Sequence, residues 1–194
     1  MNARNPILLV AAGLLLVTPL VPARAQSVKT AITLAELLAA KPGQWVRLEG
    51  MPQGDQSVKC SKARLMLGVM RDTDWALKGQ IASVDAGSRS VTVGRHKVRL
   101  LDSPKYSSPR NTLRGFGDLK SGMYVKVEGT YGKDYGFVAR KVDDQSAEVA
   151  LKPGNERRVL HQGRIDRIDP AKKTIVLMGT TYLVSEDTQV TSVQ

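Results

Sequence analysis

Hydrophobic and polar residues alternate along two short segments that closely resemble each other. In residues 43–50 (GQWVRLEG), Val46 and Leu48 alternate with polar or aromatic residues, and residues 122–129 (GMYVKVEG) repeat this pattern 79 positions later. Because successive side chains of a β-strand point to opposite faces, both segments predict a strand with one apolar face. We call this segment unit B.

A second motif, which we call unit A, also occurs twice. Residues 79–85 (GQIASVD) match residues 163–169 (GRIDRID) at an offset of 84, and a short β-rich segment follows each copy, at 90–93 and 174–177. The apolar residues of unit A stand three positions apart, and a flat strand would place them on opposite faces. We therefore expect a β-bulge that bends the strand.

The units follow one another in the order B, A, B, A, so that only the middle A and B are contiguous in that order. A bent first strand, a hairpin and returning strands suit a small closed Greek-key barrel of OB type. We therefore expect an all-β fold, with one complete OB-like barrel at 79–143. Residues 26–78 and 163–194 would each carry half of a second OB-like unit, and 144–162 would form a linker.

The two half-units are complementary. A half-barrel alone leaves an open strand edge and an uncovered apolar face, so residues 33–70 and 160–194 are expected to pair. The pairing would occur within one chain or between two chains of a swapped dimer. The alternative is that each half extends or caps the central barrel, which would leave residues 40–63 and 163–190 without mutual pairing.

Other local patterns predict few further elements. Thr33 followed by Glu36 forms a capping box, which predicts one short helix that ends before Pro42. Residues 94–95 are a predicted hairpin tip. Residues 101–115 contain two prolines and are expected to form a loop.

Four short motifs in the middle of the chain resemble those of a known family. They are Gly79-x-Ile81-x-x-Val84-Asp85, Val91-Thr92-Val93, Asp118-Leu119-x-x-Gly122-x-x-Val125-x-Val127-x-Gly129 and Val138-Ala139-Arg140-Lys141-Val142. The family consists of exported bacterial domains of unknown function with an OB-like β-barrel. The resemblance covers the middle unit and part of each flanking half-unit, and it implies an architecture without catalytic residues.

The N-terminus has the pattern of a secretory signal peptide. Arg4 precedes an apolar run at 7–20, and residues 23–25 (ARA) fit an A-x-A cleavage site. The run is shorter than the roughly 20 residues that span a bilayer. We therefore expect cleavage after Ala25, a periplasmic or secreted protein, and no stable membrane span after cleavage.

Composition narrows the classes of function. The 194 residues include 29 Lys and Arg against 18 Asp and Glu, which gives a formal net charge of +11, and the hydrophobic fraction of 42% is sufficient for a packed core. A single cysteine, Cys60, excludes an internal disulfide framework. Exported bacterial proteins meet no ATP or NAD pool, so no cofactor is expected.

Basic and aromatic residues are the candidates for ligand binding. Four cations, Arg89, Arg95, Lys97 and Arg99, lie on one predicted hairpin, and an aromatic–basic pair recurs at the same place in both B units. OB barrels bind extended ligands with stacking aromatic rings beside cations. The candidate residues are Trp45, Arg47, Arg95, Lys97, Arg99, Tyr124 and Lys126. The alternative interpretations are a solvated basic face, and rings that cover a barrel end or a seam between barrels.

Metal binding and catalysis find little support in the sequence. Cys60, Met66 and Met70 are candidate ligands of a soft metal, although residues 66–70 are more simply a strand or core segment. No zinc-protease, serine-hydrolase or nucleotide-binding motif is present, so the sequence predicts no metal site and no enzyme.

We therefore expect a non-enzymatic binding module whose ligand is an extended anionic polymer or glycan. The alternative is a protein–protein module that joins an envelope complex through exposed strand edges. Salt distinguishes the two, because binding to a polyanion weakens steeply as salt rises and strand addition largely persists.

Overall fold

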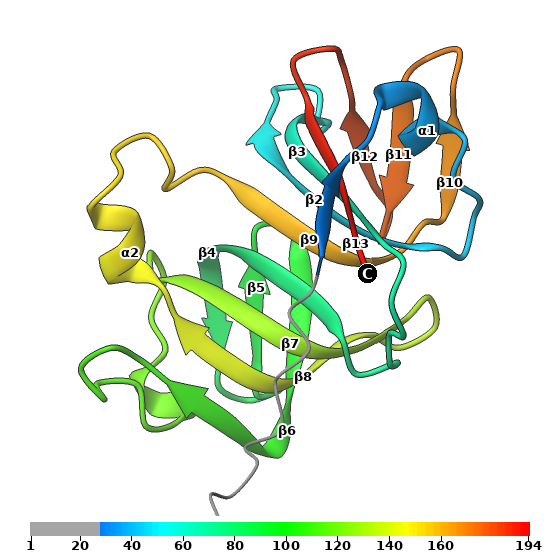
Figure 1. The fold of residues 1–194 in the computed structure, drawn as a ribbon. Helices are drawn as coiled ribbons and strands as arrows, with labels where there is room; N and C mark the ends of the chain where they lie inside the picture. Colours follow the sequence, from blue (N-terminus) through cyan, green and yellow to red (C-terminus); the bar gives the residue numbers. More distant parts are fainter. Residues whose placement is uncertain (1–27) are drawn as a thin grey trace, which may run out of the picture.

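The computed structural model describes residues 28–194, and within this range two β-barrels lie side by side (Figure 1). The predicted signal peptide at 1–25 lies outside the described residues. Between residues 28 and 194, no helix is both long and apolar enough to cross a membrane.

The central barrel is formed by five consecutive strands. They are β4 (Trp75–Asp85), β5 (Ser90–Val93), β6 (His96–Ser107), β7 (Tyr124–Gly132) and β8 (Gly136–Asp144). β4 pairs with both β5 and β7, and β6 runs parallel to β8, so the ring order is β4-β5-β6-β8-β7. This order confirms the predicted OB-like barrel. The predicted bulge is the register shift between Ile81 and Ser83 on β4.

The second barrel, which we call the composite barrel, is assembled from both ends of the chain. Its strands are β2 (Trp45–Pro52), β3 (Val58–Met66), β9 (Val159–Arg164), β10 (Arg167–Asp169), β11 (Thr174–Leu177), β12 (Thr180–Leu183) and β13 (Gln189–Val193). β2 pairs with β9, while β12 and β13 run parallel to β3. The two half-units therefore pair within one chain.

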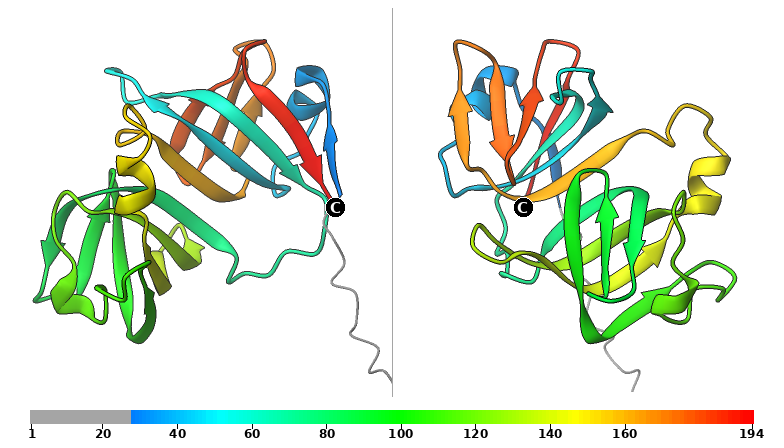
Figure 2. Two further views of the ribbon diagram at one scale, coloured as in Figure 1. Left: turned by 60° about the vertical axis from the view of Figure 1, so that its left-hand side comes forward. Right: turned by 180° about the vertical axis from the view of Figure 1, so that it is seen from behind.

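The composite barrel is a circularly permuted copy of the central barrel. β9 and β10 are the two arms of one bent strand that corresponds to β4, and the amide of Asp166 at the bend donates to the carbonyl oxygen of Val176 at 2.9 Å. β11 corresponds to β5, β12 with β13 to β6, β2 to β7, and β3 to β8. β1 (Lys29–Ala31) pairs antiparallel with β13, so the two ends of the described chain lie together (Figure 2).

β9 joins the two barrels into one hydrogen-bonded sheet. It pairs with β2 along Trp45–Gly50 and with β4 along Ala76–Lys78. In Figure 1 this strand runs between the two lobes. Side chains on the two faces of β9 therefore lie on two different surfaces of the molecule.

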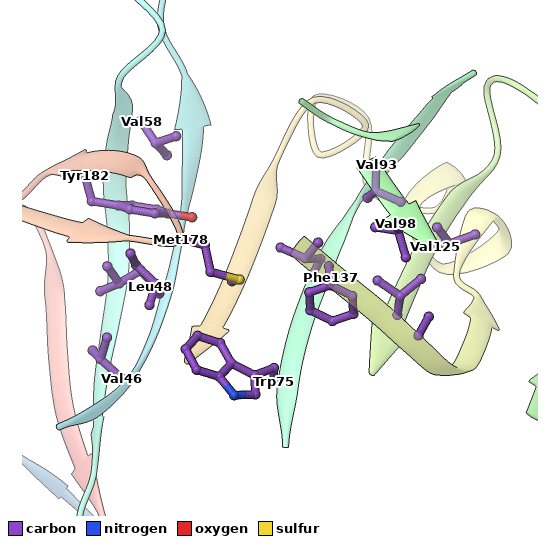
Figure 3. Close-up of a cluster of buried hydrophobic side chains, with 14 of the residues drawn as sticks. Val46, Leu48, Val58, Trp75, Val93, Val98, Val125, Phe137, Met178 and Tyr182 are labelled. Carbon is purple, nitrogen blue, oxygen red and sulfur yellow. The ribbon is translucent and has the colours of Figure 1, made fainter. Parts of the chain in front are cut away.

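Each barrel has its own packed interior. Figure 3 shows the two groups of buried side chains with Trp75 between them. The composite-barrel group includes Val46, Leu48, Val58 and Tyr182, and the central-barrel group includes Val93, Val98, Val125 and Phe137. Trp75 lies 5.1 Å from the ring centroid of Trp45 and 5.1 Å from that of Tyr131, so aromatic rings fill the seam.

The remaining elements correct some local expectations. The capping box of Thr33 and Glu36 is present, and it begins a shorter helix than predicted, α1 (Leu34–Leu38). The predicted loop at 101–115 is wrong in its first half, because β6 continues to Ser107 through parallel pairing with β8. The loop after β6 contains a 3₁₀ turn, η1 (Phe116–Asp118), and the expected linker contains α2 (Ser146–Ala150) and the start of β9.

Candidate functional site

One face of the sheet crosses both barrels, and we call it the shared face. The strand registers align two rows of residues on it, from β3 through β2, β9 and β4 to β7. The rows are Arg64, Arg47, Gln162, Ala76 and Glu128, and then Lys62, Glu49, Leu160, Lys78 and Lys126. At about 4.8 Å between neighbouring strands, this row of five strands spans about 19 Å.

A cleft of about 110 Å³ lies on the shared face where the two barrels meet. Arg47 contributes from β2 and Lys126 from β7, so the structure brings together two of the candidate residues. The Arg47 Nε donates to the Gln162 side-chain oxygen at 2.6 Å, and the Gln162 amide nitrogen donates to the carbonyl oxygen of Asp74 at 2.6 Å. This chain of hydrogen bonds holds the Arg47 guanidinium in the seam. Burial, and then the charge of Arg64, lower the pKa of Arg47, which remains a cation near neutral pH.

Glu128 lines the cleft together with these cations and with Asp74. It accepts a hydrogen bond from the Lys126 ammonium and lies 3.9 Å from the ammonium of Lys141. Burial raises the pKa of Glu128, but the hydrogen bond and charge of Lys126 outweigh burial and leave the pKa below its ordinary value. The cleft therefore holds Lys126 in an ion pair and leaves Arg47 and Arg140 as cations on its walls.

A larger hollow of about 310 Å³ lies beside this cleft, between β2, β4 and the segment that follows α2. Arg158 lies 3.2 Å from a Glu49 carboxylate oxygen and 2.9 Å from the Ser61 hydroxyl, so it is fixed in the wall. The exposed side chains of Lys62 and Lys152 also line this hollow. Among residues 28–194, neither lysine lies within ion-pair distance of a carboxylate.

The shared face is strongly basic as a whole. A third, shallow depression of about 30 Å³ lies on the same face, beside the cleft and the larger hollow. The three hollows together are lined by nine cations and four acids. These are Lys29, Arg47, Lys62, Arg64, Lys78, Lys126, Arg140, Lys152 and Arg158, against Glu49, Asp74, Glu128 and Glu148. The arrangement can bind several negative charges spaced along an extended ligand.

The other predicted cations lie elsewhere. Arg95 stands at the tip of the β5–β6 hairpin, beside a pocket that does not belong to the shared face. Lys97 and Arg99 are exposed on β6, as the alternation of inward and outward side chains along this strand predicts. β5 separates β6 from β4, and β8 separates it from β7. The structure therefore does not bring these three residues together with Lys126, because they occupy different sides of the barrel.

The two aromatic residues expected to stack on a ligand are both buried. Trp45 is 8% exposed and packs against Trp75, while Tyr124 is 5% exposed and donates its hydroxyl hydrogen bond to the carbonyl oxygen of Arg158. Burial raises the pKa of Tyr124 to about 12. Both rings point away from their own barrel interior, as predicted, but the second barrel or the segment after α2 covers them. The alternative of rings that fill the seam is the one observed for Trp45.

The soft-metal candidates do not form one group. Cys60 and Met66 are six residues apart on β3, which corresponds to about 20 Å along a strand. Cys60 is 2% exposed, and burial raises the pKa of its thiol to about 12, so the thiol stays protonated near neutral pH. Within residues 28–194, no group of three or more His, Cys, Asp or Glu side chains has the geometry of a metal site.

Sequence reasoning missed most of the shared face. Arg64, Gln162 and Arg140 join Arg47 only through strand pairing between segments up to 115 residues apart. The one sequence feature that pointed to this face is the equivalent placement of Arg47 and Lys126 in the two B units. Both follow an aromatic residue on the outward side of their strand.

The fold and this face define a protein with two OB-type barrels and a basic surface across their junction. A family model described as "Domain of unknown function (DUF5666)" matches residues 78–143 and 162–194, and the chain belongs to this family. The first matched segment corresponds to the central barrel. The second contains the end of β9 and the strands β10 to β13, which are the composite-barrel counterparts of β4, β5 and β6. The comparisons with curated proteins and with solved structures gave no match.

Proposed function

We propose that this protein is a non-enzymatic binding module that holds an extended anionic polymer or glycan on the shared face. The excess of cations carries the proposal, because nine cations against four acids line the three hollows of the shared face. The five strands that form the centre of this face span about 19 Å. Arg47, Lys126 and Arg140 would contact the ligand in the cleft between the barrels, and Lys62 and Lys152 would contact it in the larger hollow. Export through the N-terminal signal peptide would place this face among the anionic polymers of the cell envelope.

Lys62 and Lys152 are the best residues to substitute in a test. Both are exposed and lack an ion-pair partner among the described residues, so their replacement leaves no buried carboxylate uncompensated. The matched control is the double variant Lys97→Gln, Arg99→Gln on β6. It removes the same charge from exposed strand positions on another side of the molecule.

The experiment measures binding of a labelled oligothymidylate, used as a polyanion of known charge spacing, over a range of salt concentrations. Heparin serves as the competing anionic glycan. We expect Lys62→Gln with Lys152→Gln to weaken binding about tenfold and to reduce the slope of log K against log salt by about 1.4, because two contacts to the strand are lost. The control should retain the affinity and the slope. Equal losses in the two double variants, or binding that persists at high salt, would contradict a site on the shared face.

Assembly through strand edges is the alternative. β1 offers an exposed outer edge of three residues, which is a short template for strand addition. Such an interaction would depend little on salt, so the same titration with a partner from envelope extract distinguishes the two functions.

A further inference from the structure

A separate pocket, of about 440 Å³, opens at the mouth of the composite barrel. Val159 and His161 of β9 line it, whereas Leu160 lines the hollow on the shared face, so the two sites lie on opposite faces of one strand. Val58 and Thr180 contribute from the composite barrel. The hairpin tip at Arg95 and His96 of the central barrel forms the remaining side.

The walls of this pocket combine apolar side chains with hydrogen-bond donors. Val58 and Val159 are apolar, and the His96 Nε2 lies 3.2 Å from the Thr180 hydroxyl. The His161 ring meets the His96 ring edge to face, with centroids 4.7 Å apart. None of the nine residues that line the pocket is acidic.

His161, which lines the pocket, has a buried ring nitrogen without a hydrogen-bond partner in the described part of the chain. The residue is 5% exposed, and its Nδ1 has no hydrogen-bond partner among residues 28–194. Burial, followed by the charges of His96 and Arg95, lowers the pKa of His161 well below its ordinary value, and burial and Arg95 lower that of His96 to about 4. Both rings are therefore neutral near pH 7, and each has one N–H to donate.

Among the residues that the structure describes, the only charged side chain that lines the pocket is that of Arg95. It is exposed at the rim and donates hydrogen bonds to the backbone and side-chain oxygens of Gln56. A guanidinium with spare donors beside neutral imidazoles and a hydroxyl favours an anionic group over a cationic one. The apolar walls favour a hydrocarbon body.

We propose that this pocket binds a small amphiphile whose apolar body lies between Val58 and Val159 and whose carboxylate is bound by Arg95. The pocket volume is within the range of about 300–1,000 Å³ that is typical of small-molecule sites. A few polar groups in an otherwise apolar cavity are also typical of such sites. This site is independent of the polymer site on the shared face, because none of the described residues that line it belongs to that face.

The test uses decanoate as the probe, below the concentration at which it forms micelles. Calorimetric titration and the shift in melting temperature report binding, with decanol and decyltrimethylammonium as the uncharged and cationic analogues. We expect decanoate to bind most tightly and the cationic analogue most weakly. Arg95→Gln should weaken decanoate binding at least tenfold and change decanol binding less than twofold, because it removes the charge and leaves the apolar walls intact.

Lys97→Gln is the matched control, since Lys97 is an exposed cation two residues along the same hairpin and does not line the pocket. Its affinity for decanoate should equal that of the unaltered protein. A second variant, Val159→Phe, fills the cavity from a half-buried strand position and should reduce the binding of both decanoate and decanol. Equal binding of the three amphiphiles, equal losses in Arg95→Gln and Lys97→Gln, or no binding of decanoate would overturn the proposal.

Discussion

Gly50 and Gly129 occupy equivalent positions in the two copies of unit B, and each lies at a register shift of its strand. A Cβ atom at Gly50 would stand 2.2 Å from the carbonyl oxygen of Lys59, and one at Gly129 would stand 1.9 Å from that of Val138. Neither backbone oxygen can move without breaking its strand pairing. The repeated glycine is therefore a requirement of the bulge that bends both barrels.

Gly50→Ala and Gly129→Ala should each destabilise the protein. Because the added methyl group forces the paired strands apart, we expect the free energy of unfolding to fall by about 1–3 kcal/mol in either variant. Urea unfolding followed by circular dichroism measures the change. Gly54→Ala is the control, since no atom of residues 28–194 outside its chain neighbours lies within 4 Å of its added Cβ. A Gly54 variant as unstable as the other two would show that the strand contacts are not the cause.

The two histidines predict a dependence of stability on pH. His96 faces His161, Thr180 and Arg95, and burial together with Arg95 lowers its folded pKa from 6.5 to about 4. Below pH 6.5 the unfolded chain binds a proton that the folded chain does not, so stability falls as the pH falls toward 4. For His96 alone, the loss between pH 7.5 and pH 5 is about 2 kcal/mol, and His161 acts in the same direction.

Urea unfolding of the protein and of His96→Gln at both pH values tests this. The carboxylates are common to the two proteins, so the difference between their pH dependences isolates His96. The variant should lose about 2 kcal/mol less than the unaltered protein. Parallel curves would mean that the His96 pKa is not lowered in the folded state.

At the scale of elements, the repeats predicted the barrels well, because each B unit shows the alternation of a strand with one buried face. β9 was located only in part. Its match to unit A begins at Gly163, but the strand starts at Val159, just as β4 starts four residues before Gly79. The segment Val159–Gln162 shows no clear alternation, because β9 is paired on both edges and largely covered on both faces.

The candidate site was predicted less well than the fold. The alternation of inward and outward side chains along a strand correctly placed Lys97 and Arg99 on the outside. The same alternation cannot show whether a second barrel covers an outward side chain. Trp45 is outward on β2 and still buried, because β9 brings Trp75 of the other barrel against it. Which residues form the shared face depends on which strands pair with β9. These strands, β2 and β4, come from distant segments of the chain.

For the whole molecule, the permuted order of strands has a direct consequence. The backbone amide of Gln194 donates a hydrogen bond to the carbonyl oxygen of Val28 at 3.2 Å. The ends of the described chain can therefore be joined by a few glycine and serine residues. The connection between β3 and β4 is exposed, with Val69 99% exposed. Opening residues 28–194 there and joining the old ends gives a chain in which both barrels are contiguous.

This permutant should keep the same fold and fold faster. In the permutant, the central barrel no longer lies between β2 and β9 in the sequence, so fewer residues separate these paired strands. The contact order therefore falls, while the contacts of the folded state stay the same. We expect a melting temperature within a few degrees of the parent and a higher refolding rate in stopped-flow fluorescence of the Trp45–Trp75 pair. A control with the same linker but opened between Lys133 and Asp134 interrupts the β7–β8 hairpin and should lose stability. If the first permutant refolds more slowly than the parent, the central barrel must form before the two half-units can meet, and the order of strands in the natural chain is itself part of the folding mechanism.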